Sequence, residues 1–168
     1  MIFTSVLFAC LLPFMVQAQQ AVFRFAQLTD IHLSPNNPNP TEDLLRSIAQ
    51  INATDSIDFV LVTGDIAEEG DRTTMEKVKS CLDLLKVKYY VALGNHETKW
   101  SDSGCTAFGE IFGGERFEFE HKGFLFLGFN SGPLMRMAYG HVVPQDIRWM
   151  TETMERYNAG NSRPDKPV

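Results

Sequence analysis

The chain has 168 residues, enough for one domain with a sizeable hydrophobic core, and 44% of them are hydrophobic. Its 15 lysines and arginines face 21 aspartates and glutamates, giving a formal net charge of -6. This composition excludes general disorder and argues against nucleic-acid binding through a broad basic surface. It does not exclude an anionic substrate, because bound metal ions can supply positive charge locally.

Residues 1–18 have the features of a secretory signal peptide. The segment contains no Lys, Arg, Asp or Glu, and Ile2–Val16 is nearly continuous apolar sequence. Val16-Gln17-Ala18 fits the positions that a signal peptidase reads. We therefore predict cleavage after Ala18, a single exported domain over 19–168, and a secreted or periplasmic location.

Two alternatives to a cleaved signal stay open. No Lys or Arg precedes the apolar run, so a buried first strand or helix is also compatible with it. Leu7-Phe8-Ala9-Cys10 resembles a bacterial lipoprotein box, although Phe8 fits that pattern badly. The run is shorter than the roughly 20 residues of a membrane-spanning helix, so no span is predicted.

Two cysteines, Cys81 and Cys105, follow the predicted cleavage site. Export would permit a disulfide between them. We favour a buried thiol at Cys81, because it shares a helical face with Met75, Val78, Leu82 and Leu85. No Cys-x-x-Cys pair is present, so the sequence does not support a thiolate zinc site.

Predicted strands and helices then alternate along the chain. Apolar, β-branched and aromatic runs predict strands over Ala21–Leu28, Ile57–Val62 and Tyr89–Leu93. Helical spacing predicts the intervening helices over Thr41–Ile51, with Thr41 as N-cap, and from a Thr73–Glu76 capping box to about Val87. This β-α-β-α-β order implies parallel strands joined by crossover helices.

The second half begins with a predicted hairpin. Phe117–Glu120 and Phe124–Phe129 flank a turn at His121-Lys122-Gly123, and we expect this antiparallel pair to be added to the sheet. His121, beside the turn, is expected to be exposed. After it, Asn130-Ser131-Gly132 is open to two interpretations, a pocket border or a plain turn.

A last helix is predicted to begin at Pro144. Ile147, Met150 and Met154 recur there at helical spacing, and the chain becomes polar and turn-like from Asn158.

Three short polar blocks directly follow the three predicted parallel strands. They are Thr29-Asp30-Ile31-His32, Thr63-Gly64-Asp65 and Gly94-Asn95-His96-Glu97. Each block alone is compatible with an ordinary turn. Because ligands bind at the carboxyl ends of the strands in open α/β sheets, the three blocks together predict a functional site.

The residue types in these blocks suit metal chemistry. Asp30, His32, Asp65 and Asn95 offer oxygen and imidazole ligands of the kind that zinc, manganese and iron accept. Two aspartates contribute about -2 against +4 from two divalent ions, so such a site stays positive toward a phosphate. His96 is suited to donate a hydrogen bond to the phosphate or to protonate a leaving oxygen.

The series Asp30-x-His32, Gly64-Asp65 and Gly94-Asn95-His96-Glu97 resembles the calcineurin-like metallophosphoesterase superfamily, over about Val22–Trp149. That resemblance implies a four-layer αββα sandwich with two divalent or trivalent metal ions at the sheet edge. By it, Asp30 and His32 bind the first ion, Asp65 bridges, Asn95 binds the second, and His96 acts on the phosphate.

The resemblance also implies an activity. Gln145-x-x-x-Trp149 resembles the helix after the hairpin in the bacterial branch that includes cyclic-nucleotide and other small phosphodiesterases. The implied enzyme is a hydrolase that cleaves small phosphomonoesters or phosphodiesters through a metal-bound hydroxide. The ions would be manganese, zinc or iron.

The family completes its site with further histidines, which this chain lacks at the expected positions. Gly140-His141 is followed by Val142-Val143 rather than by a second histidine, so we expect His141 to be a non-ligand. Asp165–Val168 looks like the approach to the next family strand. We therefore expect a truncated, partial sandwich. The alternative to an active enzyme is an inactive or partner-dependent metal-binding remnant that pairs with a missing C-terminal half.

Overall fold

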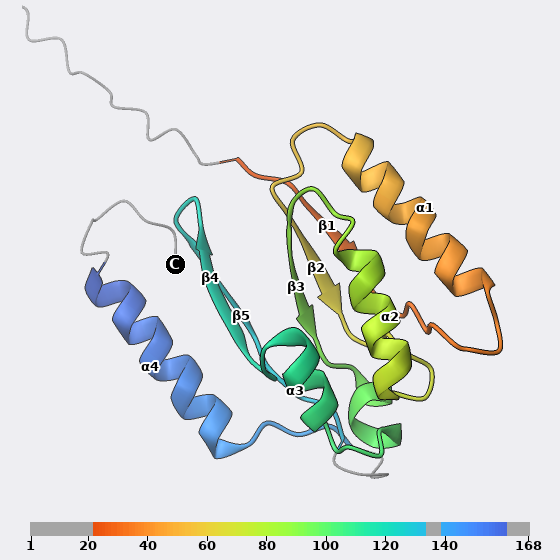
Figure 1. The fold of residues 1–168 in the computed structure, drawn as a ribbon. Helices are drawn as coiled ribbons and strands as arrows, with labels where there is room; N and C mark the ends of the chain where they lie inside the picture. The colour runs from red at the N-terminus through yellow and green to blue at the C-terminus, as the bar shows by residue number, and fades with distance from the viewer. Residues whose placement is uncertain (1–21, 134–138, 161–168) are drawn as a thin grey trace, which may run out of the picture.

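The computed structural model describes residues 22–133 and 139–160 (Figure 1). The predicted signal peptide over 1–18 and the segment Asp165–Val168 therefore lie outside the described residues.

A parallel sheet forms the centre of the fold. Its strands are β1 (Phe25–Leu28), β2 (Phe59–Thr63) and β3 (Lys88–Ala92), and they lie in the order β1-β2-β3. The β-α-β-α-β prediction is confirmed. β1 is shorter than the predicted Ala21–Leu28, and β2 and β3 are each displaced by one or two residues. The parallel register places the carboxyl ends of all three strands at one edge of the sheet.

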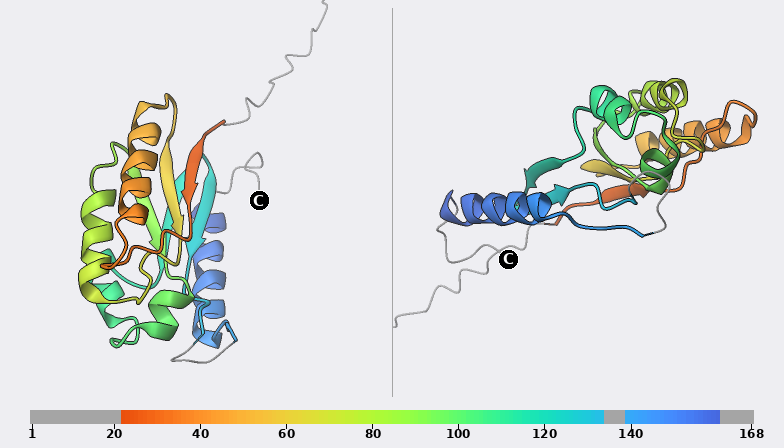
Figure 2. Two further views of the ribbon diagram at one scale, coloured as in Figure 1. Left: turned by 90° about the vertical axis from the view of Figure 1, so that its right-hand side faces the viewer. Right: turned by 90° about the horizontal axis from the view of Figure 1, so that it is seen from below.

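Helices cover one face of this sheet. α1 (Asn39–Ala53), α2 (Arg72–Leu82) and a short α3 (Thr106–Phe112), which was not predicted, lie on the same side (Figures 1 and 2). The core lies between helices and sheet and includes Leu44, Ile48, Val60, Val62, Met75, Val78, Leu82 and Phe108. Cys81 and Cys105 are free and buried here, which confirms the buried thiol at Cys81 and overturns the disulfide alternative.

The predicted helix boundaries need correction at both helices. α1 begins at Asn39 rather than after Thr41, because a proline fits the first turn of a helix. Asp71, not Thr73, caps α2, and its carboxylate accepts a hydrogen bond of 2.9 Å from the Thr74 amide. α2 also ends at Leu82 rather than near Val87. The amide of Asn52 binds the Leu84 carbonyl and the Lys86 N–H, so the chain leaves the helix there.

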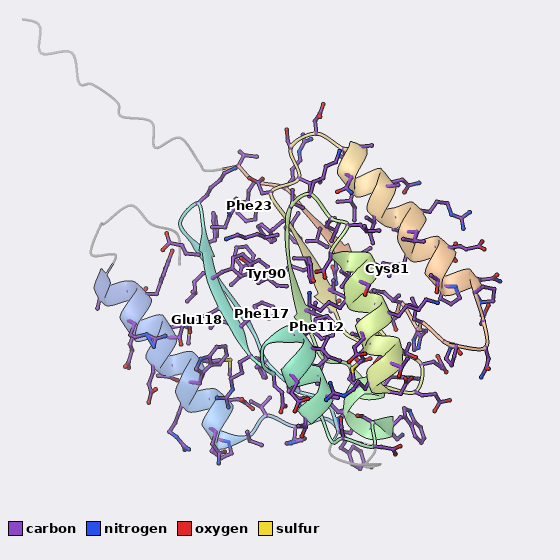
Figure 3. The ribbon with its side chains drawn as sticks, viewed as in Figure 1. Phe23, Cys81, Tyr90, Phe112, Phe117 and Glu118 are labelled. Carbon is purple, nitrogen blue, oxygen red and sulfur yellow. The ribbon has the colours of Figure 1, made fainter. Side chains whose placement is uncertain are left out.

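The hairpin forms a sheet of its own. β4 (Phe117–His121) and β5 (Phe124–Gly128) are antiparallel, as predicted, but they pair only with each other within the described residues. The expectation that the hairpin joins the parallel sheet is wrong. Alternate aromatic residues give the hairpin an apolar face, which packs on the parallel sheet: the Tyr90 and Phe119 rings stack at 3.7 Å. Phe23, Tyr90 and Phe117 lie between the two sheets in Figure 3.

The expectation that His121 is exposed is also wrong. His121 is half-buried, because its ring packs edge-on against Phe23 at 5.4 Å and Phe59 at 5.2 Å. Its Nε2 lies 3.1 Å from an Asp58 carboxylate oxygen. The turn of the hairpin is thus held against the amino-terminal end of β2, opposite the edge that carries the three polar blocks.

α4 (Pro144–Gly160) forms the fourth layer, outside the hairpin (Figure 2). The helix is confirmed, although it continues past Asn158. Its apolar residues do not all pack: Met150 is half-buried, but Ile147 is 52% and Met154 46% exposed. Asp146 and Thr153 are buried instead, because Arg116 and Glu118 of the β4 region bind them. Of the described helices, none is long and apolar enough to span a bilayer.

The four layers are therefore helices, parallel sheet, hairpin and helix. This arrangement confirms the α/β class and is consistent with the αββα sandwich of metallophosphoesterases.

Candidate metal centre

Two of the three polar blocks continue the pairing of the parallel sheet beyond its strands. The Asp30 amide donates to the Gly64 carbonyl at 3.2 Å, and the His32 amide donates to the Asp65 carbonyl at 2.9 Å. Leu33 and Ala67 form a further parallel bridge. The loops after β1 and β2 are thus fixed side by side at the lower edge of the sheet in Figure 1.

The backbone is unusual at three of the predicted site residues. Asp30, His32 and Asp65 have φ angles of 54°, 49° and 52°, in the left-handed region that non-glycine residues rarely adopt. Such conformations cost roughly 1–3 kcal/mol each and persist where the surrounding structure imposes them, often at functional sites.

Two glycines allow the second and third blocks to meet. Gly64 has a φ of 97°, and a Cβ built there would lie 2.6 Å from Gly94 Cα. A Cβ on Gly94 would collide with the Asp65 carboxylate. The glycines of Gly64-Asp65 and Gly94-Asn95 are therefore needed for the close approach of the two loops.

Glu97 holds these loops together from inside the protein. Its side chain is fully buried, and its carboxylate accepts hydrogen bonds from the amides of Gly94 at 2.8 Å, Asp65 at 3.0 Å, Ile66 at 2.9 Å and Ala67 at 3.0 Å. Burial raises the pKa of this carboxyl above its ordinary value, although the backbone donors oppose that shift. No role for Glu97 was predicted from the sequence. One signal in the sequence could have indicated this role. Glu97 is an acidic residue at the end of a polar loop block, and backbone amides in such loops need an acceptor because no strand pairs with them.

Three of the predicted residues converge. Ligating atoms of His32, Asp65 and His96 all lie within 4.8 Å of one another, and the two imidazole rings meet edge to face at 4.6 Å. The His96 amide donates to Asp65 Oδ1 at 2.9 Å. Imidazole nitrogens and a carboxylate at this spacing suit zinc, manganese or iron, so the residues present fit a metal ion.

Asp30 and Asn95 lie at the border of this group. Asp30 Oδ1 is 3.8 Å from His32 Nε2, and the Asp30 side chain is exposed. Asn95 is exposed and immediately precedes η1 (His96–Trp100), a short π-helix that was not predicted. A cavity of about 370 Å³ opens beside Asp30 and His32, between the β1 loop and α1.

His141 lies elsewhere. Together with Arg116, Asn130 and Asp146 it lines a separate cavity of about 430 Å³ between the hairpin and the start of α4. Among the described residues, it is not part of the group formed by His32, Asp65 and His96. Asn130 therefore does border a cavity, at a place distinct from this group.

Comparison with known proteins decides the family. The model of the calcineurin-like phosphoesterase family matches residues 23–162. The chain belongs to this family. The resemblance seen in the three polar blocks is thereby confirmed.

Curated relatives point to the same branch. A 3',5'-cyclic-nucleotide phosphodiesterase of Nostoc sp. is 23% identical over 137 residues, which is 77% of this chain and 50% of the relative. A probable cyclic nucleotide phosphodiesterase of Rhodopseudomonas palustris is 32% identical over 82 residues, 45% of this chain and 30% of the relative. An uncharacterized protein of Bacillus subtilis is 25% identical over 118 residues, 61% of this chain and 9% of the relative. The chain thus spans half or less of the length of each of these relatives.

Proposed function

We propose that this protein is a metal-dependent phosphoesterase that hydrolyses small phosphodiesters and phosphomonoesters. The convergence of His32, Asp65 and His96 at the carboxyl edge of the parallel sheet carries this proposal. The relatives named as cyclic nucleotide phosphodiesterases support 3',5'-cyclic nucleotides as the first substrates to test.

The proposed roles follow the resemblance. Asp30 and His32 would hold the first ion, Asp65 would be shared between the two ions, and Asn95 would hold the second. Bound metal ions of this kind acidify a water molecule and neutralise charge on the phosphate. The chain's own contribution is to keep the ligands close together and the site positive toward an anion.

His96 is proposed to act on the phosphate rather than on a metal ion. Its Nδ1 lies 2.5 Å from the Glu68 carbonyl oxygen, which can only accept, so Nδ1 carries a proton. Nε2 is then the ring nitrogen that remains to meet a ligand. From there it can bind a phosphate oxygen or, when protonated, donate to the leaving group.

Asp65→Asn should abolish the activity. The amide keeps the shape but removes the charge of the bridging group. We expect a loss of more than about 100-fold, because changes outside the ligand set alone typically cost 10–100-fold. The assay is hydrolysis of bis-p-nitrophenyl phosphate and of 3',5'-cyclic AMP with added manganese or zinc. Asp55→Asn, on an exposed loop after α1, is the matched control, and full activity in Asp65→Asn would refute the mechanism.

A second candidate is a metal-binding remnant that is inactive or that needs a partner chain. One observation favours it: the described residues bring three His and Asp side chains into one group, a small set for two ions. It predicts no turnover and less than one metal ion per chain after dialysis. Retention of two tightly bound ions per chain would contradict it.

A further inference from the structure

We propose that Glu68 is a positioning residue that holds His32 through its side chain and His96 through its backbone carbonyl. The inference rests on the proposed function, because its purpose is to aim both imidazoles at a shared ligand site. Glu68 Oε2 lies 2.9 Å from His32 Nδ1, and the Glu68 carbonyl oxygen lies 2.5 Å from His96 Nδ1.

The backbone of Glu68 is itself fixed. Its amide donates to the Leu33 carbonyl at 2.8 Å, one residue beyond the bridge between Leu33 and Ala67. On the far side, Gly70 has a φ of 58° and packs against the backbone of His96 and Glu97. The carbonyl that meets His96 is thus set by the pairing of the β1 and β2 loops.

The side chain meets His32 at a nitrogen that needs a partner. Nδ1 of His32 is buried and makes no well-aligned hydrogen bond among the described residues, so the carboxylate at 2.9 Å is the acceptor within reach. A buried N–H favours a nearby acceptor, so the carboxylate biases the His32 proton toward Nδ1. With the proton held on Nδ1, Nε2 offers its lone pair beside Asp30 Oδ1, 3.8 Å away.

One residue therefore sets the same tautomer in two histidines by two different groups. A carboxylate in this position orients a metal-binding imidazole such as that of His32 and raises its basicity, and the carbonyl orients His96 in the same way. Glu68 is 47% exposed at its side chain, so its pairing with His32 adds little to folding stability. We therefore expect Glu68 to affect the affinity for a ligand rather than the stability of the fold.

The first test is nitrogen-15 NMR of the histidine rings in the metal-free protein at about pH 8, above the usual histidine pKa of about 6.5. In the wild type we expect both His32 and His96 with the proton on Nδ1. In Glu68→Ala we expect His32 to become a mixture of tautomers while His96 stays unchanged, because the backbone carbonyl remains. Glu69→Ala, the exposed neighbour, should alter neither ring.

The second test is zinc affinity of the same proteins by calorimetry. Glu68→Ala should bind about 10–100-fold more weakly, and Glu68→Gln, whose amide oxygen still accepts from Nδ1, should recover most of the loss. An unchanged His32 tautomer in Glu68→Ala overturns the inference, as does an unchanged zinc affinity. If His32 changes tautomer but the wild type binds no zinc, the positioning stands and the proposed function fails.

Discussion

Glu97 shapes the candidate centre although it is not one of the proposed metal ligands. Its buried carboxylate accepts from four backbone amides, three in the β2 loop and one in the β3 loop. Because a carboxylate has two acceptor oxygens and no donor, it suits such a cluster of N–H groups better than any neutral side chain.

Glu97→Gln should therefore destabilise the protein. The amide has one acceptor oxygen and directs its NH₂ group at backbone donors, so buried N–H groups lose their partner. We expect the free energy of unfolding to fall by about 1–3 kcal/mol, the usual cost of an unsatisfied buried group. Urea unfolding measures the change, with Glu152→Gln on the exposed side of α4 as control. Equal stability of Glu97→Gln and the wild type would show that these bonds are not needed.

At the scale of elements, the hairpin is held to the parallel sheet at its turn as well as by aromatic packing. Asp58, just before β2, accepts from Lys122 Nζ at 2.9 Å and from the Arg24 amide at 2.9 Å. The hydrogen bond from Lys122, with that from Arg24, lowers the pKa of Asp58 to about 2, against an ordinary value of 3.8.

This pairing should make the hairpin's attachment sensitive to acid. A folded-state pKa below the unfolded value means that the contribution of Asp58 is present above about pH 4 and disappears as the pH falls toward about 2. Asp58→Asn should therefore be less stable than the wild type at pH 7, and the gap should close as the pH drops to about 2. Urea unfolding at both pH values checks this, with Asp55→Asn as control. A difference in unfolding free energy between the variant and the wild type that does not change with pH would show that the Asp58 charge is not its cause.

Sequence pattern predicted most elements but not all of their contacts. The alternating runs identified the three parallel strands, both long helices beside them, the hairpin and α4. The spacing of Ile147, Met150 and Met154 predicted the helix correctly. It did not identify the packed face, because Ile147 and Met154 are exposed and polar contacts with Arg116 and Glu118 hold α4 in place. The short α3 carries too little periodicity to be distinguished from a loop.

At the scale of the whole molecule, the predicted export depends on residues 1–18, which lie outside the described residues. We propose that the protein is exported and cleaved after Ala18. The intact mass of the protein made by its own host should then correspond to an amino terminus at Gln19. A retained Met1 would contradict cleavage, and a lipid-modified Cys10 would favour the lipoprotein alternative.

The four-layer arrangement gives this molecule one edge where loops from several strands meet. The carboxyl ends of β1, β2 and β3 lie at that edge, and the His32, Asp65 and His96 group lies there. The contacts of Asp58 with His121 and Lys122 lie at the opposite end of the sandwich. The charged groups that hold the hairpin in place are therefore separated along the sheet from those of the candidate metal centre.

The sequence by itself indicated the family, the parallel strands and the polar blocks that follow them. These are readable because hydrophobic periodicity is local, and because the ends of parallel strands necessarily meet at one edge. Only the tertiary structure decided that the hairpin forms a second sheet, that Glu97 joins two loops and that Glu68 contacts both histidines. Each of these depends on pairs of residues about 30 or more positions apart, or on a backbone carbonyl, and no local pattern encodes such contacts.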